Sequence, residues 1–435
     1  MKRSNRRAPF ARLSWEGRGD FNQPPPSSLE VWSRSGSEPP QDPRDGNRLI
    51  QADNLIAMSS LLAELEGEID MIYVDPPFLS GKAYQARIGR GEDSRQPETW
   101  KTVRGYSDSW QDGAQYLSML YPRLLLMHRL LSEKGSLYLH LDWHASAYAR
   151  VLLDEIFGPD RLLNEIVWTY HGPSPIRSAF NRKHDTILLY SKSREYTFNV
   201  DQVRVPCDDN TVKTFASSEK AGFGKQPDLE RGKVPEDWWY FPVVARLHSE
   251  RTGYPTQKPE ALLERMIKAS SNPDDLVADF FSGSGTTAVV ADRLQRRWII
   301  SDPSPLAAIT SYRRLRLAKA QRSVSWEVET GEQPHAELRL DLHLERSPEG
   351  VSCGLRGASA REGAQLRFPD DIVLWEIDPE PTSSTFHSNI CFARGFQADE
   401  LAMQATIPGR SEKGMTFRVR AFDAYGRHGI SKISL

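Results

Sequence analysis

The segment at 70–78, which reads DMIYVDPPF, constrains the fold most strongly. Its apolar residues predict a buried strand, and the acid and two prolines that follow predict where the strand ends. Pro77 keeps Pro76 out of the helical region, and neither proline can donate a hydrogen bond to a sheet. The chain must therefore leave the sheet at Asp75, with the Phe78 ring close by. Ligands bind at this edge of open α/β sheets, although a strand that ends in a Pro-Pro turn explains the segment equally well.

Length and composition indicate a globular protein of two or three domains. The chain has 435 residues, of which 39% are hydrophobic and 26% charged, with a formal net charge of -2. Such a charge gives no argument for a nucleic-acid or membrane partner. The three cysteines are widely scattered, so they predict neither a zinc site nor a disulfide framework and suit a cytoplasmic location. No apolar run reaches membrane-spanning length.

Between 47 and 322 strand-like and helix-like patterns alternate, which predicts a doubly wound, mostly parallel α/β sheet. The polar stretch at 81–111 breaks this alternation, and we expect a long loop there. The expected strands lie at 48–51, 71–74, 136–141, 165–170, 186–190, 276–278 and 298–300.

Three other regions have a different character. The first 46 residues are rich in Pro and Arg and predict a disordered arm. Residues 171–254 lack clear periodicity but combine basic residues with aromatic ones, which is typical either of a nucleic-acid contact region or of an irregular region with its own aromatic cluster. Residues 323–435 contain several alternating patterns and predict a small all-β domain at the C-terminus.

A second motif follows the expected strand at 276–278. It reads DFFSGSGTTA at 279–288 and satisfies G-x-G-x-x-A, with Asp302 at the end of the next expected strand. Gly283 and Gly285 allow a tight turn and a close approach of a ligand to the backbone. No lysine follows the second glycine, so this is not a phosphate-binding P-loop. On this motif alone an NAD-dependent Rossmann oxidoreductase remains an alternative.

The pairing of the two motifs resembles the DNA methyltransferases that methylate exocyclic amino groups with S-adenosylmethionine. The catalytic tetrapeptide comes first, then a variable region, then the F-x-G-x-G loop at 281–285. This is the order of the family's β class, which is shared with the modification subunits of type III restriction systems. The resemblance covers about 47–322 and implies a catalytic domain there, with 171–254 as the candidate target-recognition region.

The resemblance also implies a reaction and partners. The substrate would be double-stranded DNA, and adenine N6 is favoured because the tetrapeptide begins with Asp75; cytosine-N4 enzymes of the family more often begin with Ser, and cytosine N4 is the alternative. A restriction-modification or defence setting follows, with a homodimer or a restriction subunit as further candidate partners. A DNA-binding subunit that needs a partner for activity is a third hypothesis.

By resemblance, the catalytic residues are Asp75, Pro76, Pro77 and Phe78. The Asp75 carboxylate and the Pro76 carbonyl would accept hydrogen bonds from the target amino group. The Phe78 ring would stack on the base after its rotation out of the duplex.

The resemblance places the cofactor against a second set of residues. The loop around its methionine portion would comprise Asp279, Phe281, Gly283, Gly285 and Thr286. Asp302 would hold the ribose, Lys258 would lie near the cofactor carboxylate, and Asp53 would reach the cofactor adenine. Asp53 also suits a helix N-cap and Lys258 an exposed first-turn lysine.

Two positions depart from the family pattern: Phe280 replaces a proline, and Leu79 stands where Asn is common. Neither change removes a group that the chemistry needs. The segment HLDWH at 140–144 has metal-ligand residue types, but His144 lies beyond the expected strand and no fourth ligand is evident, so we predict no metal site. The helix expected at 312–322 has a basic face, for which we consider solvent exposure or DNA contact.

Overall fold

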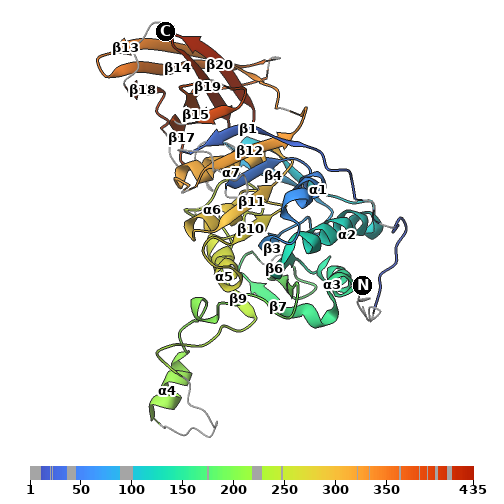
Figure 1. The fold of residues 1–435 in the computed structure, drawn as a ribbon. Helices are drawn as coiled ribbons and strands as arrows, with labels where there is room; N and C mark the ends of the chain where they lie inside the picture. Colours follow the sequence, from blue (N-terminus) through green and yellow to red (C-terminus); the bar gives the residue numbers. More distant parts are fainter. Residues whose placement is uncertain are drawn as a thin grey trace.

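The computed structural model describes residues 11–435 except for 20, 22, 37–45, 89–100, 174–175, 218–227, 246–247, 321, 333, 362–363, 382, 389, 397–399 and 409–413. The described chain forms an elongated molecule with a large sheet in its middle and a β-rich region at the C-terminal end (Figure 1). Among the described residues, none of the helices combines the length and apolar character that a membrane span requires.

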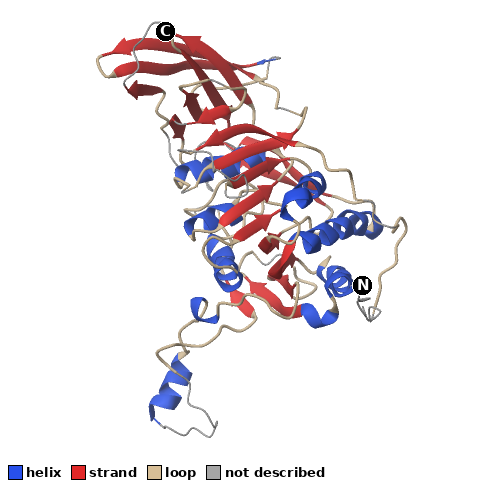
Figure 2. Ribbon diagram, viewed as in Figure 1, coloured by secondary structure: helices blue, strands red, loops and turns tan. Residues whose placement is uncertain are grey.

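Five parallel strands form the centre of the main sheet (Figure 2). They are, in spatial order, β2 (Asn47–Gln51), β11 (Arg297–Ser301), β10 (Leu276–Asp279), β3 (Ile69–Val74) and β6 (Leu131–Leu141). Beyond β6 lie β8 (His184–Ser191), β7 (Leu162–Thr169) and β9 (Trp238–Tyr240). Beyond β2 lie β12 (Val324–Glu329), which is parallel to β2 and extends the parallel run, and then β1 (Leu29–Ser35) and β16 (Phe386–Ser388). The predicted doubly wound, mostly parallel sheet is confirmed.

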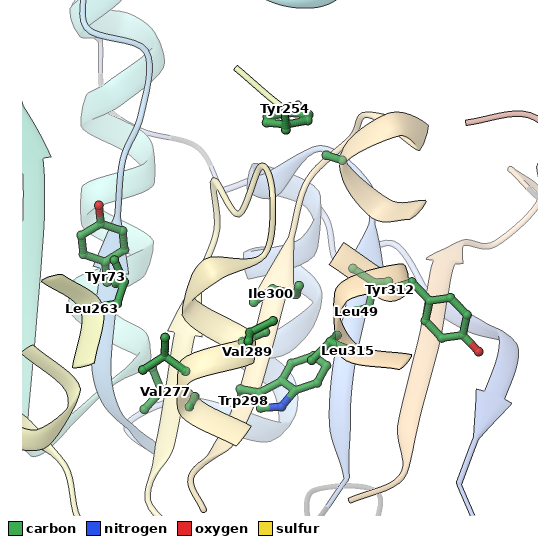
Figure 3. Packing of buried hydrophobic residues seen from close by; sticks show 14 of the residues in the cluster. Leu49, Tyr73, Tyr254, Leu263, Val277, Val289, Trp298, Ile300, Tyr312 and Leu315 are labelled. Atoms are coloured by element: carbon green, nitrogen blue, oxygen red, sulfur yellow. The ribbon is translucent and has the colours of Figure 1, made fainter. Parts of the chain in front are cut away.

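Helices cover both faces of the sheet (Figure 1). One face carries α1 (Asn54–Leu65), α2 (Gly113–Leu130) and α3 (Ser146–Phe157); the other carries α5 (Glu260–Ser270), α6 (Thr286–Arg293) and α7 (Pro305–Leu317). Alternate residues of one strand enter different cores: Val277 belongs to the core that includes Val289 of α6, whereas Ala278 belongs to the other. Figure 3 shows Val277 and Ile300 of neighbouring strands close to Val289. Burial on both faces explains the nearly continuous apolar runs.

The prediction of a disordered arm over 1–46 is wrong for 29–35, which form β1. This strand pairs antiparallel with β12 and parallel with β16, and Trp32 packs edge-on against Trp326 at 5.0 Å. These partners lie about 300 (β12) and about 350 (β16) residues away in sequence, so local composition could not reveal them. β12 likewise belongs to the main sheet although its residues were assigned to the C-terminal domain. Residues 1–10, 20, 22 and 37–45 of the predicted arm lie outside the described residues.

The prediction of a long loop over 81–111 is also wrong. Strands β4 (Lys82–Ile88) and β5 (Lys101–Asp108) pair antiparallel as a hairpin, and residues 89–100 between them lie outside the described residues. Many residues of this ribbon are partly exposed, so its sequence lacks the apolar alternation of a half-buried strand.

The region at 171–254 contains β9, the helix α4 (Asp209–Ser217) and the 3-10 turn Val200–Gln202. Another 3-10 turn, Pro159–Arg161, follows α3. Figure 1 shows α4 projecting away from the body of the molecule. The role of 171–254 in target recognition stays a prediction, and 174–175, 218–227 and 246–247 lie outside the described part.

The C-terminal region is built from two small antiparallel sheets, and the all-β prediction for it is confirmed. One contains β13 (Leu338–Ser347), β14 (Gly350–Ala360) and β18 (Gln404–Pro408). The other contains β17 (Ile390–Ala393), β15 (Ile372–Asp378), β19 (Thr416–Asp423) and β20 (His428–Ser434). Their facing residues share a separate apolar core that includes Trp375 and Phe417.

Candidate active site

Three acids lie at the carboxyl ends of adjacent strands. Asp75 follows β3, Asp279 ends β10 and Asp302 follows β11, and these strands are neighbours in the sheet. All three line one cavity of about 440 Å³, together with Pro77 and Gly283. This volume is in the range of small-molecule sites. The fold therefore brings the two sequence motifs, some two hundred residues apart, to a single cavity.

One of the two Asp75 carboxylate oxygens has a hydrogen-bond partner and the other has none among the described residues. The Oδ2 atom accepts a hydrogen bond from Lys258 Nζ, whereas the buried Oδ1 has no partner among the described residues. Lys258 Nζ also lies 5.4 Å from the centre of the Phe78 ring. Buried polar atoms are nearly always hydrogen-bonded in native proteins, so an unpaired carboxylate oxygen at a cavity indicates a place for a donor from a ligand.

The glycine loop needs both of its glycines. Gly283 and Gly285 have φ of 48° and 72°, which L-residues with side chains rarely adopt. A Cβ on Gly285 would lie 2.5 Å from the Ser311 Oγ, and one on Gly283 would lie 3.1 Å from the Tyr254 ring. The loop is thus held against α7 on one side and against a cavity-lining tyrosine on the other.

Asp279 and Asp302 stabilise this loop by accepting hydrogen bonds from its backbone and side chains. The buried Asp279 carboxylate accepts hydrogen bonds from the Phe281 amide (3.0 Å) and the Thr287 hydroxyl (2.6 Å), and burial raises its pKa to about 7. Asp302 accepts from the Gly283 amide (3.0 Å) and the Ser304 amide (2.9 Å), and burial raises its pKa to about 6. Each carboxylate oxygen of Asp302 has a second lone pair that a hydroxyl donor could use.

Of the other predicted cofactor residues, Asp53, Phe281 and Thr286 line the same cavity, whereas Gly285 does not. Asp53 and Thr286 also have partners within the protein. Asp53 caps α1 through the Leu55 amide at 2.8 Å and forms an ion pair with Arg123 at 3.2 Å. The Thr286 hydroxyl accepts from Arg314 at 2.9 Å. Phe281 lines the cavity directly.

The basic side chains expected on one face of 312–322 differ in exposure: Lys319 is exposed, whereas Arg314 is buried. The helix α7 ends at Leu317, and Arg314 is buried, where it donates to Glu260 at 2.8 Å and to the Ser284 carbonyl at 3.0 Å. Arg314 therefore supports the glycine loop from behind. Helical periodicity could not show this, because its partners come from α5 and from the loop before α6.

The segment at 140–144 divides its polar groups between separate partners. His140 is buried, with Nδ1 2.9 Å from the Tyr73 hydroxyl and Nε2 3.3 Å from the Asp185 carboxylate. Asp142 instead bonds to the His144 ring at 2.7 Å. Within the part of the chain that the structure describes, no group of three metal-ligand side chains is close enough to hold an ion.

Sequence reasoning missed several cavity residues. Tyr106 and Trp110 reach the cavity from the hairpin and the segment after it, and Tyr254 reaches it from the segment before α5. Aromatic residues at 106 and 110 within a polar stretch could have indicated a ligand contact. Only the pairing of β4 with β5, however, places them beside the tetrapeptide.

Comparison with known proteins agrees with this geometry. Residues 69–305, more than half of the chain, match the family model described as DNA methylase (N6_N4_Mtase). The DNA adenine methyltransferase YhdJ of Escherichia coli K12 is 30% identical over 270 residues, which cover 61% of this chain and 81% of that protein. The type II methyltransferase M.EcaI of Enterobacter cloacae is 27% identical over 365 residues, covering 70% and 77% respectively.

A third relative and a solved structure complete the comparison. The type II methyltransferase M.HpaI of Haemophilus parainfluenzae is 32% identical over 254 residues, covering 58% of this chain and 68% of that protein. The crystal structure of the M1.HpyAVI-SAM complex is 19% identical, with a TM-score of 0.41, and the match covers 62% of this chain and 98% of that one. The chain belongs to the N6/N4 family of DNA methylases, which are S-adenosylmethionine-dependent enzymes.

Proposed function

We propose that this DNA methylase transfers the methyl group to the exocyclic N6 of adenine in double-stranded DNA. The observation that carries the proposal is the Asp75 carboxylate, whose unpaired Oδ1 shares a cavity with the glycine loop. The tetrapeptide begins with Asp, as in most adenine-specific members that the sequence resembles. The similarity to a DNA adenine methyltransferase supports the same choice.

The residues at the cavity fit S-adenosylmethionine. Asp302 would accept hydrogen bonds from the ribose hydroxyls, Asp53 would face the adenine amino group, and Gly283, which lines the cavity, would leave room for the methionine portion. Gly285 does not line the cavity and would act by letting the loop pack against Ser311 of α7. Asp279, Phe281 and Thr286 would shape that loop, and Lys258 would approach the carboxylate end. When bound, the cofactor supplies a methyl group activated by its positive sulfonium.

The tetrapeptide would activate the target nitrogen by accepting its hydrogens. The lone pair of an aromatic amino group is delocalised into the ring, so the nitrogen is a poor nucleophile. Acceptors at the Asp75 carboxylate and the Pro76 carbonyl favour a pyramidal nitrogen whose lone pair points toward the methyl group. Pro77 fixes the turn, and the Phe78 ring would hold the extruded base by stacking.

The biological setting belongs to the same proposal. The type II methyltransferases among the relatives favour a restriction-modification or defence role, in the cytoplasm, with a homodimer or a restriction subunit as candidate partners. The likeness to type III modification subunits stays a prediction. The family assignment removes the dehydrogenase interpretation, whereas dependence on a partner subunit is decided by whether the purified chain acts alone.

A direct assay tests the proposed function. The purified chain is incubated with S-adenosylmethionine carrying an isotopic methyl label and with unmethylated genomic DNA, which is then digested to nucleosides and analysed by mass spectrometry. We expect labelled N6-methyladenine. Labelled N4-methylcytosine would favour the alternative target, and no labelled nucleoside from the chain alone would contradict the proposal.

We expect cofactor affinity to fall below about pH 6. The raised pKa of Asp302 means that this carboxyl takes up a proton there and loses acceptor strength toward ribose hydroxyls. Binding favours the ionised form of Asp302, so the affinity falls as the pH drops below about 6. Titration calorimetry between pH 5 and 8 measures the trend.

Asp302→Asn is the matched control for this pH dependence. Since hydrogen bonds to a charged group contribute about 1.5–3 kcal/mol, the variant should bind roughly 10- to 100-fold more weakly at pH 7.5 and show little further loss at pH 5. A wild-type affinity that does not change between pH 5 and 7 would contradict the prediction.

A further inference from the structure

Asp108 holds the turn that follows the catalytic tetrapeptide. It ends β5, is 1% exposed, and forms no ion pair with any described residue. Its carboxylate accepts hydrogen bonds from three consecutive amides, those of Phe78 (3.1 Å), Leu79 (2.9 Å) and Ser80 (2.8 Å). The Ser80 hydroxyl (2.6 Å) and the Trp110 indole nitrogen (2.8 Å) donate to it as well.

This arrangement is a nest of amides around a buried anion. Successive backbone N–H groups that converge on one point bind an anion well, and hydrogen bonds to a charged acceptor are the stronger kind. Without the carboxylate, three amides of one partly buried turn would lose their partner. Asp108 therefore determines the path of the chain directly after Pro77.

Leu79 makes the turn more dependent on this support. Its φ is 65°, in the left-handed region that Asn adopts more readily than Leu. Members of the family commonly have Asn at this position. In this chain the leucine adopts a conformation that is unfavourable for its side chain. The hydrogen bond from the Leu79 amide to Asp108 stabilises that conformation.

We propose that Asp108 is a positioning residue for methyl transfer. The carboxylate does not line the cavity, but its neighbours Ser107 and Trp110 do. By fixing the amides at 78–80, it sets the orientation of the Phe78 ring and of the carbonyls before it, and it couples the β4–β5 hairpin to the tetrapeptide. The inference rests on the proposed function.

Asp108→Asn tests the inference, because the amide keeps one oxygen but turns N–H donors toward the nest. We expect kcat for DNA methylation to fall about 100-fold, the loss associated with a displacement of about 1 Å in an active site. Cofactor affinity, measured by calorimetry without DNA, should change less than about threefold. Hydrogen exchange of a peptide spanning 76–80, followed by mass spectrometry, should accelerate at least about tenfold.

Two companion variants sharpen the test. Ser80→Ala removes one donor and leaves the three amides in place, so kcat should stay within about threefold of the wild type. Leu79→Asn in the Asp108→Asn background should recover about tenfold of the lost rate, because asparagine tolerates the left-handed conformation. This non-additivity in a double-mutant cycle would not arise from a general loss of stability.

The contradicting outcomes are distinct. An Asp108→Asn enzyme that is folded and methylates DNA within threefold of the wild type overturns the inference, and so does unchanged exchange at 78–80. Should this variant not fold, Asp108→Glu replaces it, because glutamate keeps the negative charge but moves it by one methylene group. We expect at least a tenfold lower kcat for Asp108→Glu with cofactor affinity retained. A wild-type kcat for this variant overturns the inference. A wild-type chain that methylates no DNA overturns the proposed function itself, before any variant is compared.

Discussion

Asp75→Ala is expected to abolish methyl transfer, with kcat at least about a thousandfold lower. Removing one properly placed hydrogen-bonding group from a reacting centre typically costs 100- to 1000-fold, and here the substitution removes the proposed acceptor together with its negative charge. Cofactor affinity should be largely retained, because Asp302 and the glycine loop stay in place. Single-turnover methylation of DNA measures the first effect and calorimetry the second.

Asp75→Asn and Asp341→Asn are the controls. The first keeps one acceptor oxygen but leaves Lys258, whose ammonium pairs with Asp75, without its anion, so we expect a loss almost as large as in the alanine variant. The second makes the same chemical change at an exposed site on β13 and should not alter kcat. An Asp75→Ala enzyme with more than a tenth of the wild-type rate would contradict the assigned role.

The parts of the fold that could be predicted are those with local signals. The strand at 71–74 that ends on Asp75 and the glycine turn after β10 both follow from residues whose backbone preferences are strict: two prolines in one case and two glycines in the other. Their meeting at one cavity follows from topology, because parallel neighbouring strands present their carboxyl ends at the same edge. This explains why the two motifs sufficed to predict that they share one cavity.

The parts that could not be predicted depend on partners distant in sequence. The turn at 78–80 needs Asp108, which lies in a stretch without periodicity, and Lys258 pairs with an acid 183 positions away. β1 is a strand only because β12 and β16 lie beside it. In each case the conformation or the bonding partner is determined by residues distant in sequence. Such tertiary contacts outweigh the preferences of the local sequence.

Removing the charge of Arg420 is expected to lower the free energy of unfolding by about 3–5 kcal/mol, the usual cost of leaving a buried partner charge uncompensated. Arg420 in β19 and Glu376 in β15 are both fully buried, and the Arg420 Nε donates to Glu376 at 2.7 Å. The guanidinium lies 4.4 Å from the ring centres of Trp32 and of Phe386, contacts that add cation–π attraction.

This pair joins the C-terminal region to the catalytic sheet. Arg420 also donates to the Ser33 hydroxyl of β1 at 2.9 Å, and Glu376 accepts from the Tyr312 hydroxyl of α7 at 3.0 Å. The loss in Arg420→Met should therefore appear first at this junction. Urea unfolding followed by tryptophan fluorescence measures the stability, and faster hydrogen exchange in β1 and β15 would locate the loss.

Two further variants distinguish the contribution of the buried ion pair to stability from the general effect of replacing an arginine. Arg129→Met breaks an exposed ion pair with Glu66 and should cost less than about 1 kcal/mol. Arg420→Met combined with Glu376→Leu removes both charges and should recover much of the loss, because an apolar pair avoids the desolvation of two ions. Wild-type stability in Arg420→Met alone would show that the pair does not hold the C-terminal region, and the apolar contacts of Trp32 with Trp326 and Phe422 would then have to carry the junction.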